Sequence, residues 1–360
     1  MVKIFWQGPL RSATLHRMSK SAIIGFGMYL PSDRIRTADI AAHWKQDAGA
    51  IQNGLGVQEK TVPGEGEDAF TMAYEAGKQA IEMAEIKPAQ ISAAFVGSES
   101  HPYAVKPTSG MVADALDLDP FCHCADLEFA CKAGTASMQI VDSMVRAKQI
   151  RYGLAIGSDT AQAAPGDALE YTAAAGAAAV VIGPERSKHA LCRIDYTLSF
   201  TTDTPDFWRG AQDKYPSHAG RFTGEPAYFR HMREATKGIL EVAECETKDI
   251  NHVVLHMPNA KFPGKVAKEF GFSKEQMKHG FIVPHIGNTY SACSPLGLTH
   301  VLQQAKEGET ILLVSYGSGA GSDAFLFTML RDGVLLPSDN RASHYLSYGE
   351  YSRRGHAVAA

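Results

Sequence analysis

Short apolar runs alternate with stretches of helical spacing along most of the chain, from residue 21 to about residue 330. A short apolar run between turn residues predicts a buried strand, and apolar residues recurring every three or four positions predict an amphipathic helix. Regular alternation of the two is typical of an α/β protein. The predicted strands are 92–96, 152–156, 177–182, 253–255 and 310–315, and the predicted helices are 70–84, 226–245 and 261–270.

A weak internal duplication accompanies this alternation. Cys131 lies 32 residues after Glu99, and Asn288 lies 32 residues after His256, with each pair following the end of a predicted strand. A repeat of this kind predicts two similar halves that bring the four residues toward a shared centre. Equal spacing of four selected residues also arises by chance, so the spacing alone leaves the duplication open.

Composition narrows the class of protein. The chain has 360 residues, 45% of them hydrophobic, and a formal net charge of −4. It is long enough for roughly two domains with ample core. The absence of a basic stripe interleaved with aromatic residues argues against nucleic-acid binding, and no apolar run approaches the ~20 residues of a membrane span. Six cysteines without a secretory signal are typical of reduced thiols, so we expect a cytoplasmic protein.

The first seventeen residues differ from the rest. They contain Lys3, Arg11, His16 and Arg17 but no acidic residue, and Met18 offers a second possible start. The apolar core and cleavage site of a targeting signal are missing, so we interpret the segment as an extension or an alternative start and assign it no function. The predicted organisation is an N-terminal extension (1–17), an N-terminal half (18–188), a C-terminal half (189–335) and a C-terminal tail (336–360).

Cys131 is the first candidate for chemistry. Small residues follow it, and the helical spacing that begins at Ala136 places it near the first turn of a helix. Unpaired amides and the helix dipole at such a position favour negative charge, so we expect a thiolate, the nucleophilic form of cysteine. The alternative is a small buried cysteine with a packing role, because free cysteine is among the most buried residue types.

Long motifs around these residues carry a family resemblance. The chain resembles the archaeal-type 3-hydroxy-3-methylglutaryl-CoA (HMG-CoA) synthases, which belong to the thiolase-fold superfamily. The resemblance extends over about residues 20 to 355 and implies an α/β thiolase fold, in which two similar βαβ-type halves form a layered αβαβα core. The matching motifs are 96–108, 125–135 (ADLEFACKAGT), 164–176, 201–208, 220–229, 287–291 (GNTYS) and 315–323 (SYGSGAGSD).

The resemblance implies a Claisen-type condensation in the mevalonate pathway to isoprenoids. Acetyl-CoA would acylate Cys131, and the acetyl-enzyme would attack acetoacetyl-CoA. Hydrolysis would then release HMG-CoA, after free CoA has left in the first step. Neither a cofactor nor a metal is implied, because the CoA thioesters are substrates.

Carbon–carbon bond formation requires a base for the acetyl methyl group and an acid for the new alkoxide. A carboxyl group whose pKa is raised by an apolar site can perform both tasks, and the resemblance gives this role to Glu99. It also implies that His256 polarises the acetoacetyl carbonyl and that Asn288 donates a hydrogen bond near the same thioester. The family often has Gln where Met257 stands. Without the resemblance, a glutamate after a strand is usually solvated and a single histidine is usually structural.

The remaining candidates concern substrate binding. Backbone amides of Cys131 and, by the resemblance, Ser318 would stabilise the oxyanion, although a Gly-Ser-Gly turn is also common after a buried strand. Lys261 and Lys265 would meet the CoA phosphates, with a solvated helix face as the alternative. The matched motifs also contain Thr172 and Thr223, which could line the acyl pocket.

Three other signals receive a structural interpretation. The run 122–124 (Cys-His-Cys) lacks the ligand spacing of structural zinc and alternates as a strand would. Gly25 and Gly27 do not form a dinucleotide fingerprint, because a third glycine and a following helix are missing. Cys293 is expected to pack in the core.

Two alternative functions remain open from the sequence. A ketoacyl synthase III uses Cys, His and Asn without a carboxylate at the position of Glu99, and a superfamily subunit could act as a structural partner that lacks the catalytic cysteine. The presence of both Glu99 and Cys131 favours the synthase. For partners, the resemblance implies a homodimer and a complex with acetoacetyl-CoA thiolase through a small zinc-ribbon/OB-fold bridging protein. The segment 345–354 resembles the C-terminus of the family and could mediate contacts.

Overall fold

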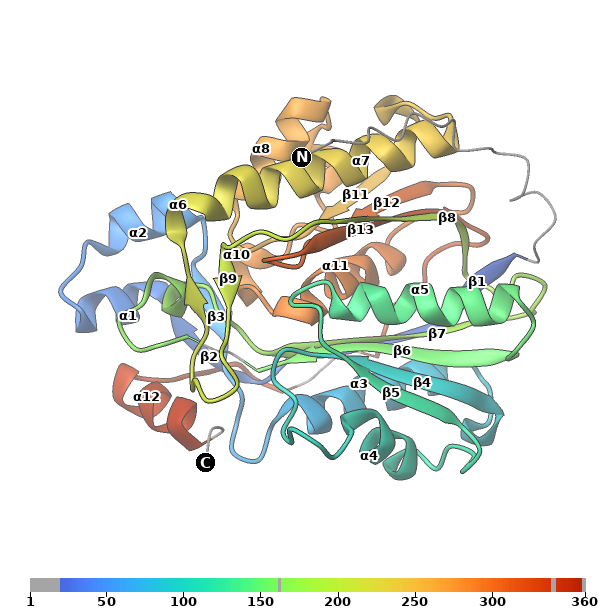
Figure 1. The fold of residues 1–360 in the computed structure, drawn as a ribbon, viewed down its shortest axis with the longest axis horizontal. Helices are drawn as coiled ribbons and strands as arrows, with labels where there is room; N and C mark the ends of the chain where they lie inside the picture. The colour runs from blue at the N-terminus through green and yellow to red at the C-terminus, as the bar shows by residue number, and fades with distance from the viewer. Residues whose placement is uncertain (1–19, 161–162, 338–340, 358–360) are drawn as a thin grey trace, which may run out of the picture.

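Five alternating layers of helices and strands make up the body of the molecule (Figure 1). Helices α7 and α8 cover one outer face, helices α3 and α4 cover the other, and α5 and α11 lie between two layers of strands. The computed structural model describes residues 20–160, 163–337 and 341–357. The predicted extension 1–17 lies outside the described residues.

Nine strands form one hydrogen-bonded sheet in the order β11-β12-β13-β8-β1-β7-β6-β4-β5. The sheet divides where β1 and β8 pair over only three residues, so that its two parts stack above and below α5 and α11 (Figure 1). The first part contains β1 (Ser21–Tyr29), β7 (Gly176–Pro184), β6 (Tyr152–Asp159), β4 (Ile91–Gly97) and β5 (His123–Leu127). The second contains β8 (Cys192–Thr201), β13 (Gly321–Met329), β12 (Thr310–Val314) and β11 (His252–Leu255).

The same pairing order occurs in both parts. Strand β4 pairs parallel with β6, β6 antiparallel with β7, and β7 antiparallel with β1. In the second part, β11 pairs parallel with β12, β12 antiparallel with β13, and β13 antiparallel with β8. Glu99 therefore follows β4, and His256 follows the equivalent strand β11. The two similar halves are confirmed, and the limits predicted for each half stay a prediction.

Helices complete the layers and the outer parts of the fold. The long α7 packs on β8 and β13, as α3 packs on β1 and β7. The helices are α1 (Thr37–His43), α2 (Ala48–Leu55), α3 (Ala69–Met83), α4 (Thr108–Ala115), α5 (Ala133–Arg146), α6 (Gly220–Phe222), α7 (Phe229–Ala243), α8 (Lys261–Phe270), α9 (Lys274–Met277), α10 (Val283–Ile286), α11 (Cys293–Leu302) and α12 (Tyr348–Ala357).

Two small sheets flank the body at the end where α1, α2 and α12 lie (Figure 1). Strands β9 (Phe207–Trp208) and β10 (Ser217–His218) form a hairpin. Strand β2 (Asp33–Arg36) pairs with β3 (Glu59–Thr61) on one side and with β14 (His344–Tyr345) of the C-terminal tail on the other. The tail is therefore joined to an N-terminal strand by backbone hydrogen bonds.

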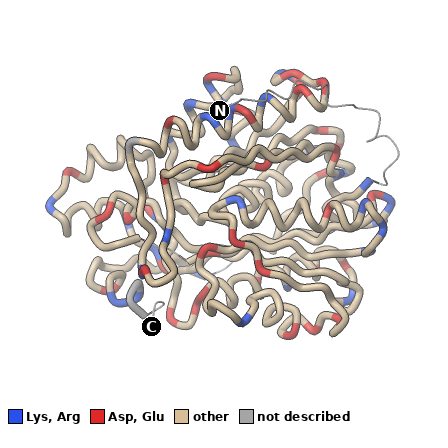
Figure 2. Tube along the Cα trace, viewed as in Figure 1, with Lys and Arg blue, Asp and Glu red and all other residues tan. Residues whose placement is uncertain are grey.

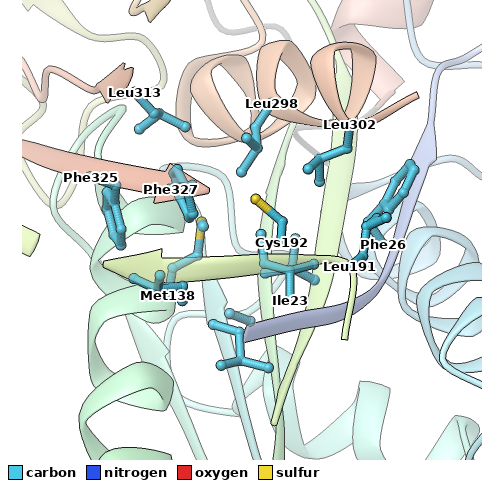
Figure 3. Packing of buried hydrophobic residues seen from close by; sticks show 14 of the residues in the cluster. Ile23, Phe26, Met138, Leu191, Cys192, Leu298, Leu302, Leu313, Phe325 and Phe327 are labelled. Carbon is cyan, nitrogen blue, oxygen red and sulfur yellow. The ribbon is translucent and has the colours of Figure 1, made fainter. Parts of the chain in front are cut away.

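The main core lies in the middle of the molecule, between the two parts of the sheet (Figure 3). It combines side chains from β1, β8, β12 and β13 with side chains of the central helices α5 and α11. Phe325 and Phe327 are fully buried with nearly parallel rings 5.5 Å apart. Burying apolar surface on both faces of these helices is the main favourable term that holds the two halves together.

Most predicted elements are present with small differences at their ends. Helix α8 has the predicted limits, and the strands expected at 92–96 and 152–156 correspond to β4 and β6. The helix expected from Pro226 leads into α7: Glu225, directly before the proline, has an extended backbone (φ −118°, ψ 135°), and helical backbone follows it. The Cys-His-Cys run enters strand β5, as its alternation predicted.

Acidic and basic residues are interspersed over the outer helices and loops (Figure 2). This mixture agrees with the near-neutral formal charge of the sequence. None of the helices in the described residues is long and apolar enough to cross a membrane.

Three glycines allow backbone segments to meet at the centre of the fold. A Cβ at Gly134 in α5 or at Gly157 in β6 would lie 2.4 Å from the Ser291 carbonyl oxygen, and a Cβ at Gly97 would lie 2.2 Å from the Ala133 carbonyl carbon. The ends of β4 and β6, the start of α5 and the segment before α11 therefore meet at backbone contact distance. This contact requires residues without side chains.

We expect Gly134→Ala to lower the free energy of unfolding by about 1–3 kcal/mol, because the added methyl group overpacks a backbone contact. The matched control is Gly54→Ala in α2, where a Cβ would meet nothing within 4 Å. The control should stabilise the protein by about 0.5 kcal/mol, since alanine has the higher helix propensity. Chemical denaturation measures both variants, and equal stability of the two would contradict the overpacking argument.

Candidate active site

Cys131 lies in a sharply turned segment between β5 and α5. Ala130, directly before it, has a left-handed backbone with φ of 44°, which costs a non-glycine residue about 1 kcal/mol. Hydrogen bonds from the Lys132 amide to the Phe129 carbonyl (3.2 Å) and from the Ala133 amide to the Ala130 carbonyl (3.0 Å) close the turn. Cys131 is buried, with 3% of its surface exposed, and lies just before the first turn of α5, as predicted.

Glu99 and Cys131 are in direct contact. The Sγ atom of Cys131 donates a hydrogen bond to Oε1 of Glu99 at 3.0 Å. Burial raises the pKa of Glu99 to about 8, and the nearby Asp159 carboxylate contributes to the increase. The predicted increase in this pKa is therefore confirmed, and a glutamate that a sequence reader would place in a solvated loop lies against the thiol.

The sequence predicts a thiolate at Cys131, and this prediction is wrong for the resting protein. Burial raises the pKa of the thiol well above its ordinary value, and the charge and hydrogen bond of Glu99 raise it further. The start of helix α5 favours negative charge, but removal from water and a neighbouring carboxylate outweigh that effect. Cys131 therefore rests as a thiol that donates its hydrogen bond to Glu99.

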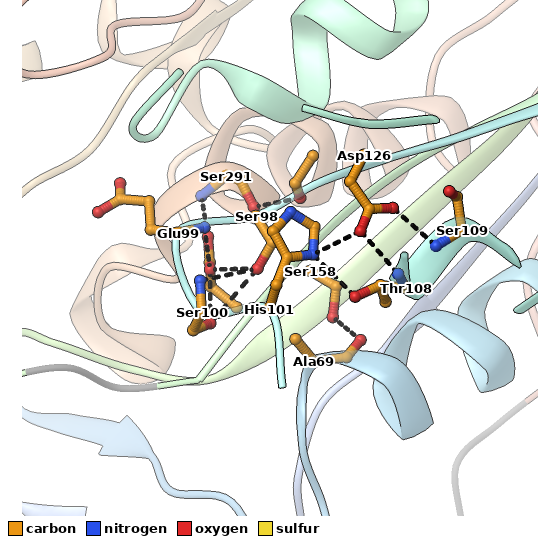
Figure 4. Close-up of polar contacts among 12 residues, drawn as sticks. Ala69, Ser98, Glu99, Ser100, His101, Thr108, Ser109, Asp126, Ser158 and Ser291 are labelled. Carbon is orange, nitrogen blue, oxygen red and sulfur yellow. Dashed lines mark hydrogen bonds and ion pairs between the residues drawn. The ribbon is translucent and has the colours of Figure 1, made fainter. Parts of the chain in front are cut away.

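Asp159, at the end of β6, holds the segment that carries Glu99. Its Oδ1 accepts hydrogen bonds from the Ser98 hydroxyl (2.8 Å), the Glu99 amide (2.7 Å) and the Ser100 hydroxyl (2.7 Å). Its Oδ2 accepts one from the Ser291 amide (2.8 Å) in the other half of the chain. The Glu99 side chain points away from this network (Figure 4), so the carboxylate of Asp159 fixes the backbone and leaves the Glu99 carboxyl group available.

A second carboxylate holds the far end of the same loop. Asp126, on β5, accepts hydrogen bonds from the Thr108 amide (2.6 Å) and the Ser109 amide (2.7 Å) at the start of α4. His101 shares a hydrogen bond of 2.8 Å with the Thr108 hydroxyl, and its ring lies 3.5 Å from Asp126 (Figure 4). The loop that carries Glu99 is therefore attached to the sheet at both ends.

The predicted Gly-Ser-Gly turn lies against the cysteine segment. A Cβ at Gly317 would be 2.6 Å from the Phe129 carbonyl oxygen, so only glycine permits this approach. In the part of the chain that the structure describes, the backbone amides of Cys131 and Ser318 have no hydrogen-bond acceptor. Both amides could therefore donate hydrogen bonds to an oxyanion, and the oxyanion role that the resemblance implies for this pair stays a prediction.

Asp206 fixes this turn. Its carboxylate accepts hydrogen bonds from the Gly319 amide (2.9 Å) and the Tyr316 hydroxyl (2.8 Å). The Tyr316 ring in turn lies 6.1 Å from the ring of His256. Asp206 is completely buried, and it connects the turn that carries Ser318 to the neighbourhood of the predicted histidine.

His256 is a neutral, buried histidine. Its surface is 1% exposed, and burial lowers its pKa to about 3. Its backbone carbonyl accepts a hydrogen bond from the Tyr228 hydroxyl (2.7 Å). Nδ1 is buried without a hydrogen-bond partner among the described residues. A neutral imidazole with an unsatisfied ring nitrogen can bind a polar ligand atom, but it does not supply a positive charge at neutral pH.

Asn288 and Thr172 form part of the wall beside Cys131. The Asn288 amide donates to the Thr172 carbonyl (2.7 Å), and its Oδ1 accepts from the Tyr290 amide (3.0 Å). Tyr290 and Ala173, the neighbours of these residues in the chain, pack against Cys131 in one buried cluster. The structure therefore brings Asn288 and Thr172 into the surroundings of the thiol.

The other predicted binding residues lie farther out. Lys261 and Lys265 are exposed on the first turns of α8, and the Lys265 ammonium group lies 5.6 Å from the Phe229 ring centre. Thr223 precedes α7, and its Oγ1 is buried without a partner among the described residues. No contact in the described structure joins these three residues to Cys131.

The hairpin β9–β10 covers the site from the side. The Arg209 guanidinium, next to β9, donates a hydrogen bond to the Glu99 carbonyl (3.0 Å), and Phe207 packs against the cluster around Cys131. On β10, His218 Nε2 lies 3.1 Å from the Asp167 carboxylate. The hairpin thus touches both the Glu99 loop and the segment that leads to Thr172.

Sequence reasoning missed several residues of this site. Asp159 lies three residues beyond the predicted strand 152–156, and Asp206 lies inside the matched motif 201–208, so the sequence carried a signal for each. Lys132 and Asp323 also escaped notice, although they form a buried ion pair of 2.9 Å directly behind the cysteine segment. Within the described ranges, no group of three or more His, Cys, Asp or Glu residues could hold a metal ion.

Comparisons with known proteins agree with this geometry. Residues 17–187 match the family model described as the hydroxymethylglutaryl-coenzyme A synthase N terminal, and residues 240–329 match that of the 3-oxoacyl-[acyl-carrier-protein] synthase III C terminal. An HMG-CoA synthase crystallised with CoA superposes with a TM-score of 0.82 at 22% identity, covering 93% of this chain and 90% of that one. The 3-oxoacyl-[acyl-carrier-protein] synthase III of Aquifex aeolicus gives 0.79 at 23% identity, over 86% and 99% of the chains. These neighbours show the thiolase fold.

Two archaeal relatives are much more similar in sequence. The hydroxymethylglutaryl-CoA synthase of Archaeoglobus fulgidus is 57% identical over 303 residues, which cover 84% of this chain and 87% of the relative. That of Methanocaldococcus jannaschii is 52% identical over 332 residues, covering 92% and 95%. Identity of this extent shows that the chain belongs to the hydroxymethylglutaryl-CoA synthase family.

Proposed function

We propose that the enzyme condenses acetyl-CoA with acetoacetyl-CoA and water to give HMG-CoA and free CoA, through an acetyl group on Cys131. The observation that carries this proposal is the contact of 3.0 Å between the Cys131 thiol and the Glu99 carboxyl group. A ketoacyl synthase III has no carboxylate at this place, so the contact favours the synthase although the C-terminal half matches the ketoacyl synthase model.

In the first step, Cys131 attacks the thioester carbon of acetyl-CoA. Because the thiol rests protonated and donates its hydrogen bond to Glu99, the carboxylate accepts this proton as the carbon–sulfur bond forms. The amides of Cys131 and Ser318 stabilise the oxyanion, and the departing CoA thiolate takes the thiol proton from Glu99, which leaves Glu99 ionised for the second step. The products are acetyl-Cys131 and CoA.

In the second step, Glu99 removes a proton from the acetyl methyl group. The resulting carbanion attacks the ketone carbon of acetoacetyl-CoA, and the protonated Glu99 returns the proton to the new alkoxide. His256 donates a hydrogen bond to the ketone oxygen as a neutral imidazole, and Asn288 orients the thioester. Water then cleaves the bond to Cys131, which restores the thiol and leaves HMG-CoA with the CoA that entered in acetoacetyl-CoA.

The outer residues are assigned to the rest of the substrate. Lys261 and Lys265 are exposed cations on one end of α8, and we assign them to the CoA phosphates. Thr172 and Thr223 are assigned to the acyl pocket. The Thr223 hydroxyl has no hydrogen-bond partner in the described ranges, which supports this role, because a buried polar group without a hydrogen bond is costly unless a ligand supplies one.

A homodimer is part of the proposal. Strand β5 lies at one end of the nine-stranded sheet, and Phe121, just before it, is 96% exposed. A strand at the edge of a sheet, beside an exposed aromatic residue, favours pairing with a second copy of the chain. We propose that β5 of one copy pairs with β5 of the other.

The proposal also includes a biological setting. The reaction places the enzyme in the mevalonate pathway in the cytoplasm, and family membership supports a complex with acetoacetyl-CoA thiolase through a zinc-ribbon/OB-fold bridging protein. The thiolase step is thermodynamically uphill, so direct transfer of acetoacetyl-CoA to the site would be an advantage.

Exposure to acetyl-CoA alone should add one acetyl group, on Cys131, and release one equivalent of CoA. Peptide mass spectrometry locates the adduct, and a thiol reagent measures the CoA. Cys131→Ala should show neither, whereas Cys293→Ala serves as the control because this buried cysteine lies outside the proposed chemistry. An adduct on another residue, or no six-carbon acid after acetoacetyl-CoA is added, would contradict the proposal.

The rate of condensation should rise as the pH is raised from 6, reach half its maximum near pH 8 and level off above about pH 9. Only the ionised form of Glu99 removes the methyl proton, and its pKa is about 8. His256, with a pKa of about 3, should give no inflection near pH 6.5. Plots of kcat/KM for acetoacetyl-CoA against pH test this directly. An inflection near 6.5 would require a charged histidine and would count against the assignment.

Replacing Glu99 with Gln should make Cys131 easier to ionise, although turnover is lost. The substitution removes a negative charge that raises the pKa of the thiol, so a larger fraction is thiolate at any pH above neutrality. Alkylation by iodoacetamide at pH 8–10, followed by peptide mass spectrometry, measures this change. The Cys293 peptide is the internal control. Slower or unchanged alkylation of Cys131 in the variant would contradict the argument that Glu99 raises the pKa of the Cys131 thiol.

A further inference from the structure

A completely buried lysine lies beneath the wall of the active site. Lys60, on β3, has no exposed surface. Its ammonium group donates hydrogen bonds to the Glu170 carbonyl and to the Tyr351 hydroxyl (3.0 Å), and it lies 4.7 Å from the centre of the Tyr351 ring. The reaction described above does not use this residue, yet burying a lysine is costly unless its hydrogen bonds are made.

Strand β3 supports both segments of the wall beside Cys131. A Cβ at Gly287 would lie 2.8 Å from both the Lys60 Cβ and the Thr172 carbonyl oxygen, so the turn before Asn288 rests directly on Lys60. The neighbouring Thr61 hydroxyl accepts a hydrogen bond from the Ala175 amide (3.1 Å). The segments that contain Thr172 and Asn288 therefore share one support.

Helix α12 of the C-terminal tail holds this support in place. Tyr351 contacts Lys60, and the Tyr348 hydroxyl donates to the Glu170 carboxylate (2.9 Å). The Tyr348 ring also stacks on His43, with 3.7 Å between ring centres. Glu170 accepts a further hydrogen bond from the Trp44 indole (2.9 Å). Two tyrosines of the tail thus contact this buried pair, Tyr351 at the Lys60 ammonium group and Tyr348 at the Glu170 carboxylate.

The environment of Lys60 supports this description. Burial lowers its pKa to about 7, while the Glu170 carboxylate acts in the opposite direction. Within the described residues, the hydrogen bonds to the Glu170 carbonyl and the Tyr351 hydroxyl are the polar contacts that replace water at this amine. Loss of the Tyr351 hydroxyl therefore leaves a buried donor with one partner fewer.

We propose that Lys60 is a positioning residue for acetoacetyl-CoA, held by Tyr351, so that helix α12 forms part of the frame of the active site. This inference rests on the function proposed above. Lys60 acts through the segments that carry Thr172 and Asn288, and it touches neither substrate. The Glu99 loop and the cysteine segment are held by other residues, Asp159 and Asp323, so acetylation of Cys131 does not depend on Lys60.

The test separates the two half-reactions in Tyr351→Phe, Lys60→Met and Lys60→Arg. Tyr351→Phe keeps the ring and removes the hydroxyl, and it should raise KM for acetoacetyl-CoA about fivefold. Lys60→Met should raise this KM further. Lys60→Arg should bring the KM partly back toward the wild-type value. In all three variants, the rate of Cys131 acetylation by acetyl-CoA should stay within about twofold of the wild type. The matched control is Tyr345→Phe, because Tyr345 is 40% exposed and its hydroxyl donates to Glu59, the neighbour of Lys60 on β3 (2.9 Å).

The outcomes distinguish this inference from the proposed function. If the wild-type enzyme forms no HMG-CoA, the proposed function fails, and this inference fails with it. If the wild type is active and Tyr351→Phe and Lys60→Met keep its KM, the inference alone is wrong. Thermal unfolding is measured in parallel, and equal losses of acetylation and condensation that follow a lowered Tm would assign Lys60 to stability and overturn the positioning role.

Discussion

The contact between the Cys131 thiol and the Glu99 carboxyl group is the interaction on which the site depends. Cys131 is buried and Glu99 is half-buried, and the two groups share one hydrogen bond of 3.0 Å. Burial raises the pKa of each, so neither is permanently charged in the resting protein at neutral pH. In the proposed reaction the ionised fraction of Glu99 accepts the thiol proton, and this transfer leaves the net charge of the cavity unchanged, whereas a low-dielectric site would resist a change in charge.

The rest of the structure keeps these two groups at that separation. Asp159 fixes the backbone of Glu99 and also binds the Ser291 amide of the other half, so one carboxylate ties the Glu99 loop to the junction of the halves. The ion pair of Lys132 with Asp323 attaches the cysteine segment to β13. Each anchor is a buried polar group with its hydrogen bonds made, which gives geometric precision but little net stability. The apolar layer around α5 and α11 supplies the stability that these anchors do not.

The family resemblance predicted the layered fold and named the central residues, whose roles stay proposals, but nothing in the sequence predicted how these residues are held. Helix α8 was located to the residue because one amphipathic period defines it, and the helical backbone that leads into α7 follows Glu225, which is extended because it precedes a proline. Asp159 was not recognised because its donors come from segments near residues 98 and 291, and local pattern rules do not join such distant positions. The state of Cys131 was predicted wrongly for the same reason. The helix start is a local feature, but the burial and the carboxylate that determine the pKa of the thiol come from the fold.

The two halves of the chain contribute different chemistry from equivalent positions. Strand β4 leads to Glu99, whose pKa is raised so that it can exchange a proton near neutral pH, while the equivalent strand β11 leads to His256, whose pKa is lowered so that it stays neutral. Burial causes both shifts, because it penalises the charged form of either group. Burial alone therefore shifts the two pKa values in opposite directions, because one residue is an acid and the other a base. A duplicated fold can in this way place a proton carrier in one half and a neutral hydrogen-bonding group in the other. In the proposed reaction the acid–base work then falls to Glu99, because it is the group in contact with the proposed nucleophile.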